Sequence, residues 1–262
     1  TLLSPVAVAW HPGGAYALIC APGDAVYRYD RAAGAVAIVA RAGTDVRWQA
    51  ITFTPDGARA MLLANTTTSS VRRGRFFVWD HATSMLAERT DLNPTSGTGF
   101  ESIKFAPDGS RAAVLLRSNN VTTVRFHDAT GAMVGTPAAR GMVAGTGCND
   151  LAWVTDGFGE PAIAIGCGVS TAEILQLDNL TGTPRFTQLV MPGQVSNVSQ
   201  VSAHPRGHLA LAIDGTYRLS RYRTGRWDTG FSSPMARSAS GVTFNDDGSR
   251  ALAFGGYGVL TE

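Results

Sequence analysis

The sequence predicts an all-β protein, a β-propeller of four-stranded antiparallel blades, from three observations. A turn built around Pro, Asp and Gly recurs six times in the 262 residues, apolar strands flank each turn, and no segment has helical periodicity of useful length. Self-similarity with a period of about 40–50 residues is typical of propellers, in which each repeat forms one blade. The repeated turns span residues 10–14, 53–57, 105–109, 153–157, 203–207 and 244–248.

The strand before each turn carries apolar residues at alternate positions. In the second repeat Ile51 lies two positions before the aromatic Phe53, so the two side chains share one face of the strand. The other repeats keep this spacing, and only Ala203 interrupts the series of aromatic residues. We expect these first strands at residues 6–10, 50–53, 102–105, 150–153, 200–203 and 241–244.

The strand after each turn is almost continuously apolar, which indicates burial on both faces, as between stacked sheets. These second strands are expected at residues 15–20, 59–63, 111–116, 162–166, 209–213 and 250–254.

A third strand follows and ends in an acidic residue and a turn in four of the repeats. An Asp carboxylate accepts hydrogen bonds from the backbone amides of a turn, so Asp with a nearby Gly or Ser is turn chemistry. The third strands are expected at residues 27–30, 77–80, 125–128, 175–178 and 221–224, and fourth strands at, for example, residues 35–40 and 185–190.

The spacing of the turns sets the number of blades. The turn glycines are 41 to 52 residues apart, so residues 1–262 form a single propeller domain of six blades, with seven blades as the alternative. We expect the N-terminal residues 1–4 to join the last blade as its missing outer strand, because closing the ring in this way removes an exposed sheet edge.

The aromatic residue, the Pro-Asp-Gly turn and the apolar run after it resemble the WD40-like repeats of bacterial β-propellers. Residues 53–64 and 105–117 are most similar to the repeat of TolB-like proteins, and Trp79-Asp80 is the one literal Trp-Asp pair. The chain lacks the Gly-His dipeptide of eukaryotic WD40 repeats, so their hydrogen-bond network is not expected here. The resemblance implies a rigid binding platform and no particular ligand.

Composition and motifs narrow the classes of function. The net charge is +2, from 22 basic and 20 acidic residues, so no global basic field attracts nucleic acid. No apolar run approaches the ~18 residues of a membrane span. We find no catalytic motif, metal-ligand spacing or cofactor-binding loop. His11 and His204 occupy the same slot before the turn proline, which favours a role in the repeat over one as ligands.

Two of the three cysteines lie on either side of one predicted hairpin. Cys148 precedes the first strand of the fourth repeat and Cys167 ends its second strand, so the two face each other at about the distance of antiparallel neighbours. A disulfide and a pair of small buried thiols both fit this placement. A disulfide would indicate an oxidising, periplasmic or extracellular location, and a chain that starts without Met fits a processed or trimmed N-terminus.

The polar residues four positions before the turn aromatic form a ring in register from repeat to repeat. Inner strands line the channel of a propeller, so we expect these residues and their neighbours to form a binding site at the channel mouth. A solvated funnel that holds ordered water is the alternative. The candidate residues are Trp48, Gln49, Glu101, Asn149, Asp150, Ser199, Gln200 and Ser240.

A second candidate site lies in the segment 65–75, which is rich in Thr and Ser. Arg72, Arg73 and Arg75 are close together in what we expect to be a loop, and three guanidinium groups can hold a phosphate or a carboxylate. A solvated loop without a ligand is the alternative. The segment 91–99 is expected to form a second long loop on the same face.

These observations favour a non-enzymatic scaffold that binds a protein, a peptide or another ligand on its loop-rich face. A metal-dependent propeller hydrolase or lyase is one alternative, with Glu101, Asn149 and Asp150 as a weak cation site. A carbohydrate-binding propeller is the other, with Trp48 or Trp227 as a stacking platform.

Overall fold

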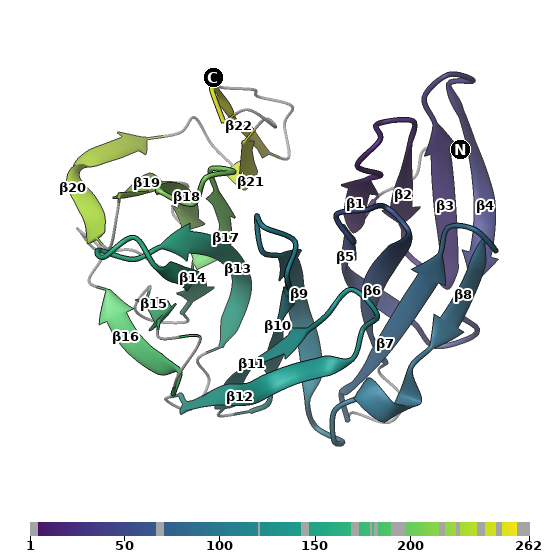
Figure 1. Cartoon of the computed structure of the whole chain (residues 1–262), viewed down its shortest axis with the longest axis horizontal. Coiled ribbons are helices and arrows are strands. Elements are labelled where there is room, and N and C mark those ends of the chain that lie inside the picture. The colour runs from purple at the N-terminus through teal and green to yellow at the C-terminus, as the bar shows by residue number, and fades with distance from the viewer. Residues whose placement is uncertain are drawn as a thin grey trace. The chain divides into compact units, whose positions relative to one another are not determined.

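The computed structural model describes most of the chain as antiparallel β-sheets (Figure 1). The residues outside the description are 1–4, 67–70, 120, 143–146, 169–172, 179, 181–182, 190–197, 215–217, 224–225, 235–238, 245–247 and 256–262. The described residues form five four-stranded sheets and one two-stranded sheet, and their helical structure consists of one 3₁₀ turn, η2 (Thr90–Leu92).

The chain divides into two compact units, which are described one at a time. Unit 1 comprises Thr1–Asn119 and Thr123–Pro137, and unit 2 comprises Asn120–Thr122 and Ala138–Glu262.

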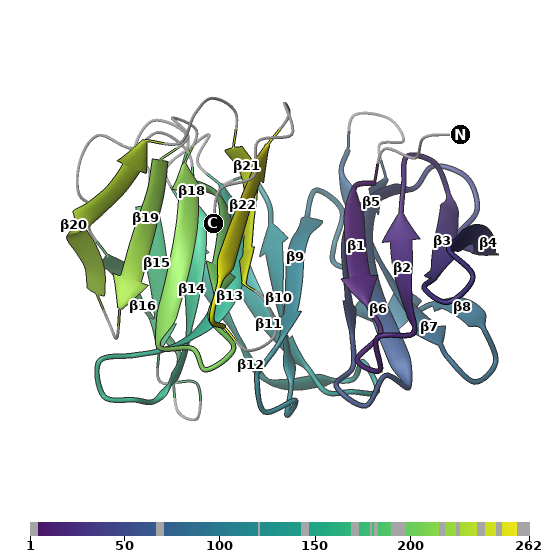
Figure 2. The same cartoon turned by 90° about the horizontal axis from the view of Figure 1, so that it is seen from above.

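Unit 1 contains three sheets, and in each of them consecutive strands are neighbours. Figure 2 shows the four strands of the first sheet side by side. That sheet contains β1 (Ala7–Trp10), β2 (Tyr16–Cys20), β3 (Ala25–Asp30) and β4 (Ala35–Arg41). The second contains β5 (Arg47–Phe53), β6 (Arg59–Thr66), β7 (Arg73–Asp80) and β8 (Met85–Glu88). The third contains β9 (Gly99–Phe105), β10 (Ala112–Arg117), β11 (Val121–His127) and β12 (Met133–Gly141), with the ends of the last two counted in unit 2.

Unit 2 repeats the pattern. Its sheets are β13 (Cys148–Thr155), β14 (Pro161–Cys167), β15 (Glu173–Asp178) and β16 (Arg185–Leu189); then β17 (Val198–Ala203), β18 (Leu209–Asp214), β19 (Arg218–Arg223) and β20 (Arg226–Pro234); then β21 (Ala239–Phe244) with β22 (Ala251–Gly255).

The predicted first and second strands are all present, and most extend by one to three residues beyond the predicted ends. The prediction of a loop over 65–75 is wrong at both ends, because β6 continues to Thr66 and β7 already begins at Arg73. The predicted closing strand at residues 1–4 lies outside the described residues.

Neighbouring sheets within a unit pack face to face. In unit 1, Tyr16 and Leu18 of β2 share a core cluster with Ile51 and Phe53 of β5 and with Trp79 of β7. The second strands are buried on both faces, as their continuous apolar sequence predicts: β6 is buried throughout except at Arg59. Full burial of each large aliphatic side chain contributes about 1.5–3 kcal/mol.

The outer face of the first sheet is apolar and largely uncovered. Two cross-strand rows make up this face: Val8, Ile19, Tyr27 and Ile38 in one, and Trp10, Ala17, Tyr29 and Val36 in the other. Val8, Trp10, Val36 and Ile38 are each about half exposed. Apolar surface of this extent on a sheet normally packs against another layer.

The repeated turns stack on one another from sheet to sheet. Gly57 has φ +71°, and a Cβ there would lie 2.3 Å from Nε2 of His11 in the preceding repeat. Gly248 has φ +73°, and a Cβ there would lie 2.0 Å from Nε2 of His204. Each imidazole is oriented by an amide two residues further on, which donates to Nδ1 at 3.0 Å. This geometry agrees with a structural role for both histidines, which pack over the turn glycine of the next repeat.

Repeat four has a longer turn than its sequence suggests. The glycine with a left-handed conformation is Gly159, φ +86°, and not Gly157. The Asp156 carboxylate accepts hydrogen bonds from the amides of Phe158 and Glu160, which widens the loop.

Candidate functional site

The channel-mouth candidates lie at or next to a β-bulge in the first strand of repeats two to six. In β5 the register passes from Trp48 opposite Ala64 directly to Ala50 opposite Leu63, so Gln49 has no partner on β6. The same skip falls on the equivalent residue in four other first strands: Glu101, Asn149, Ser199 and Ser240. A bulge redirects a side chain out of the regular alternation, and bulges are frequent beside functional sites.

In unit 1 the bulge residues and their neighbour are bound internally. Gln49 donates from Nε2 to the carbonyls of Arg47 and Trp48 at 3.2 and 3.0 Å. Glu101 pairs with Arg72 at 2.6 Å. Trp48 is 1% exposed and packs edge-on against Phe77, so its ring belongs to the core and does not line an open surface.

In unit 2 the equivalent polar side chains tie one first strand to the next. Asn149 donates to the carbonyl of Val198 at 2.9 Å, and the Asp150 carboxylate accepts the amide of Val201 at 3.1 Å. Gln200 repeats the second contact one sheet further on, accepting the amide of Val242 at 2.8 Å. These three candidates therefore hold sheets together. Ser199 is exposed, and the side chains of Ser240 and Trp227 lie outside the description.

The two cysteines of the predicted hairpin form a disulfide. Cys148 and Cys167 lie opposite each other on β13 and β14, next to the bulge at Asn149, and their sulfurs are bonded. The third cysteine, Cys20, is a buried thiol, and burial raises its pKa to about 12.

The three arginines of segment 65–75 do not act as one cluster. Arg73 and Arg75 are two positions apart on β7, so they share a face, whereas Arg72 turns to β9. Arg72 pairs with Glu101 and also donates to the carbonyl of Phe100 at 3.0 Å. A Cβ at Gly99 would lie 2.1 Å from Nε of Arg72, so the arginine requires glycine there.

Arg73 and Arg75 line a pocket of about 620 Å³ in unit 1. The walls come from the β4–β5 and β8–β9 connections and from the facing ends of β6 and β7, which is the edge that the sequence predicts to be rich in loops. The lining residues are Thr44, Asp45, Thr66, Arg73, Gly74, Arg75, Glu88, Asn93, Pro94 and Ser96.

The pocket has a rigid polar floor made by Arg75, Glu88 and Asn93. The Arg75 guanidinium donates from Nε and Nη2 to the two oxygens of Glu88, at 3.0 and 2.5 Å. Asn93 donates to the same carboxylate at 2.9 Å and accepts the amide of Phe76 at 2.8 Å. The hydrogen bonds from Arg75 hold the pKa of Glu88 below its usual value, so the carboxylate stays ionised.

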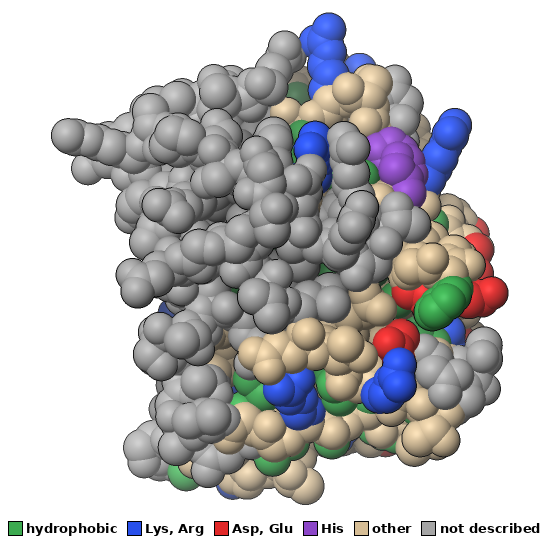
Figure 3. Space-filling view, turned by 90° about the vertical axis from the view of Figure 1, so that its left-hand side faces the viewer, with side chains coloured by type: hydrophobic (Ala, Val, Ile, Leu, Met, Phe, Trp, Pro, Cys, Tyr) green, Lys and Arg blue, Asp and Glu red, His purple; other side chains and the backbone are tan. Residues whose placement is uncertain are grey.

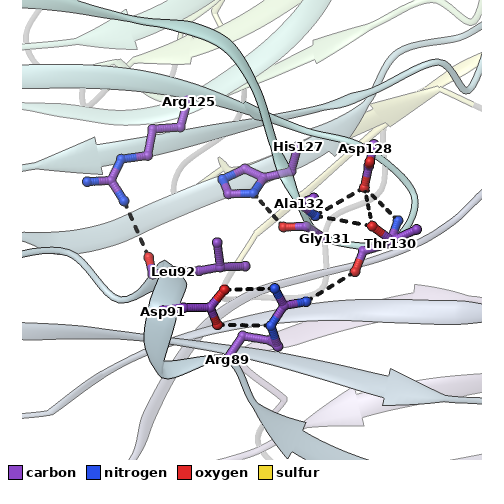
Figure 4. A network of polar contacts seen from close by, with 9 residues as sticks. All are labelled: Arg89, Asp91, Leu92, Arg125, His127, Asp128, Thr130, Gly131 and Ala132. Atoms are coloured by element: carbon purple, nitrogen blue, oxygen red, sulfur yellow. Dashed lines mark hydrogen bonds and ion pairs between the residues drawn. The ribbon is translucent and has the colours of Figure 1, made fainter.

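A network of polar contacts holds the β8–β9 connection (Figure 4). Arg89 binds Asp91 through two hydrogen bonds at 2.9 and 2.8 Å and reaches the carbonyl of Thr130 at 3.4 Å. Arg125 of β11 donates to the carbonyl of Leu92 at 3.3 Å. Buried His127 contacts the carbonyl of Gly131 through Nδ1 at 2.9 Å. The connection that carries Asn93 and Pro94 is thus anchored to the third sheet.

A smaller depression of about 360 Å³ adjoins the pocket and shares Thr44 and Asp45 with it. Asp45 has φ +63°, a left-handed conformation that costs energy for a residue other than glycine. Nearby, Arg41 pairs with Asp24 at 2.8 Å. Sequence reasoning missed Asp45 and Glu88, because neither falls on a position that repeats. Asn93 lies in the segment 91–99, which the sequence indicates as a long loop without naming this residue.

The following statements about metal sites, membrane spans and surface charge concern only the residues that the structure describes. No three His, Cys, Asp or Glu side chains among them gather closely enough to hold a metal ion. In the described part of the chain no helix is long and apolar enough to cross a membrane. Figure 3 shows one side of the molecule, where basic and acidic side chains are scattered over the described surface without forming one block of a single charge.

Comparison with known proteins identifies the fold and no function. No protein-family model matches the chain, and no curated protein matches its sequence. Among solved structures it is similar to Kuenenia stuttgartiensis hydrazine synthase, with a TM-score of 0.61 and 16% identity over 100% of this chain and 96% of that chain. This similarity and the four-stranded antiparallel sheets support a β-propeller-like all-β fold, and a fold shared at this identity carries no function with it.

Proposed function

We propose that this protein is a non-enzymatic scaffold that binds a polypeptide partner, and that the pocket of unit 1 is the contact site. The observation that carries the proposal is the floor formed by Arg75, Glu88 and Asn93, whose side chains are held in place before any ligand arrives. A preorganised polar surface binds without the entropy cost of ordering it. Loops on a rigid scaffold are a common place for such a surface.

The alternatives have less support from the same residues. A metal-dependent hydrolase would need Glu101 and Asp150 as ligands, but Glu101 is paired with Arg72 and Asp150 accepts a backbone amide. A carbohydrate-binding propeller would need Trp48 or Trp227 as an exposed aromatic platform; Trp48 is buried, and the side chain of Trp227 lies outside the description.

The finer features of the fold belong to the same proposal. We infer six blades of a WD40-like or TolB-like type, closed by residues 1–4 pairing with the last blade, with seven blades as the alternative. The half-exposed apolar face of the first sheet supports closure, because it offers a surface for a further sheet. The disulfide between Cys148 and Cys167 supports a periplasmic or extracellular location.

Site-specific crosslinking tests the proposed function. A photoreactive amino acid replaces exposed Ser96 at the pocket or, as the matched control, exposed Ser110 in the Pro-Asp-Gly turn of the third repeat. In extracts of the source cells, one defined partner is expected to crosslink at position 96 and not at 110. Equal crosslinking at both positions, or none at 96, contradicts the proposal.

A further inference from the structure

Most charges around the pocket are already paired within unit 1. Glu88 neutralises Arg75, and in the adjoining depression Asp24 neutralises Arg41. Two exposed charges remain in the lining of the main pocket, Arg73 and Asp45. Neither side chain makes a hydrogen bond or an ion pair with any residue that the structure describes. The pocket therefore presents one unpaired positive and one unpaired negative group.

The positive group is extended by the neighbouring arginine. Arg73 and Arg75 share a face of β7 and both line the pocket. Glu88 occupies Nε and Nη2 of Arg75, which leaves Nη1 without a hydrogen bond among the described residues. A carboxylate placed here meets the Arg73 guanidinium and the fixed Nη1 of Arg75, the kind of charge-assisted contact that arginine makes best.

The negative group is held at the boundary between the two depressions. Asp45 adopts its left-handed conformation after Gly43, φ +84°, in a connection that is tied down because Ala42 donates its amide to the carbonyl of Asp24 at 2.9 Å. Strained backbone persists where the surroundings fix it, and it is frequent at binding sites. A basic side chain that reaches Asp45 finds a carboxylate that is held by no hydrogen bond or ion pair, although it interacts electrostatically with Arg75.

The remaining lining favours a polypeptide over a sugar ring. Thr44, Thr66 and Ser96 supply hydroxyl groups that hydrogen-bond to a backbone, and no aromatic side chain is among the lining residues. On the basis of the function proposed above, we propose that this pocket recognises a polypeptide segment with an acidic and a basic side chain close together. Its carboxylate binds Arg73 and Arg75, and its basic group binds Asp45.

Four capped tetrapeptides test this charge preference: Gly-Glu-Lys-Gly, Gly-Glu-Glu-Gly, Gly-Lys-Lys-Gly and Gly-Gln-Gln-Gly. Binding to the full chain is followed by NMR shifts of the amides of Asp45 and Arg73. The Glu-Lys peptide is expected to bind about threefold to tenfold more tightly than the Gln-Gln peptide, since two exposed ion pairs form. Free lysine and glutamate, added as separate arms, distinguish a small amino acid ligand from a peptide.

Charge reversal makes the test specific. Arg73→Glu leaves two acidic groups in the lining and is expected to shift the preference to the Lys-Lys peptide, whereas Asp45→Lys shifts it to the Glu-Glu peptide. Arg31→Glu, in the turn after β3 and outside the pocket lining, serves as the control and keeps the original order.

The outcomes separate the two proposals. Equal affinity for all peptides, no shift at Asp45 and Arg73 with any of them, or an unchanged order in the reversal variants overturns the charge preference. The scaffold proposal survives that result if crosslinking still occurs at position 96 and not at 110. Tighter binding of a free amino acid than of the Glu-Lys peptide overturns the polypeptide as the ligand.

Discussion

The imidazole of His11 occupies the space that a side chain at Gly57 would need, 2.3 Å from the site of a Cβ. The same ring lies edge-on to Phe53 with centroids 5.4 Å apart, and His204 and Phe244 repeat this at 5.8 Å. One repeat therefore covers the turn glycine of the next.

Gly57→Ala is expected to destabilise unit 1 by about 1–3 kcal/mol more than Gly34→Ala, measured by urea unfolding. Both glycines have a left-handed φ, +71° and +61°, but nothing lies within 4 Å of a Cβ at Gly34. The matched glycine thus isolates the clash with His11 from the cost of the backbone conformation. Equal losses of stability in the two variants would show that the His11 side chain moves aside without measurable cost.

The disulfide between Cys148 and Cys167 predicts a specific thiol count. In denaturant without reductant one thiol, that of Cys20, is expected to react with a chromogenic disulfide reagent, and after reduction three are expected. Replacing both bonded cysteines by Ser is expected to cost about 2–4 kcal/mol of stability. Three reactive thiols before reduction would rule out the bond.

The contact between Asp150 and the amide of Val201 predicts a structural role for this channel-mouth candidate. Asp150→Ala removes the acceptor and is expected to cost about 1–3 kcal/mol, because a buried amide loses its partner. Asp150→Asn keeps an acceptor oxygen and is expected to recover part of the loss. Normal stability together with lost partner binding in Asp150→Ala would instead place this residue in a binding site.

The strands follow from the sequence, and so does the equivalence of the residues that the bulges leave unpaired, because both repeat. Gln49 and Glu101 were predicted to be equivalent from their distance to the turn aromatic, and each is the unpaired residue of a bulge. What they contact could not be predicted, because bulges arise from pairing between strands.

The pocket residues could be predicted only in part. Arg72, Arg73 and Arg75 are close in sequence, but alternation along the strand directs Arg72 toward Glu101. Glu88 and Asn93 reach the pocket through tertiary packing, which no local sequence pattern indicates.

Burial of His127 predicts a loss of stability in mild acid. Burial lowers the pKa of this imidazole below its ordinary value of 6.5. The unfolded chain therefore binds the proton more readily, so the full stability is present above pH 6.5 and declines as the pH falls through that value toward the folded pKa. His127→Gln is expected to flatten this decline. Identical pH profiles for wild type and His127→Gln would contradict the assignment.

The apolar outer face of the first sheet predicts a covering layer. Trp10 on that face is about half exposed within the described structure. If the last blade closes the ring, acrylamide quenching of Trp10 is expected to rise severalfold when residues 239–262 are deleted. The other four tryptophans, Trp48, Trp79, Trp153 and Trp227, are replaced by Phe in the parent and deleted chains, so that only Trp10 contributes a signal. Equal quenching of Trp10 in the two chains would contradict the prediction that the last blade covers this face.

Hydrogen exchange of the complex with the partner crosslinked at position 96 tests the central claim most directly. The pocket is predicted to be the contact site, so amides of residues 42–47 and 93–98 are expected to exchange more slowly in the complex than in the free protein. The turn at residues 107–111 is expected to exchange equally in both. Slowing confined to that turn, or no slowing around the pocket, would contradict the assignment of the pocket as the binding site.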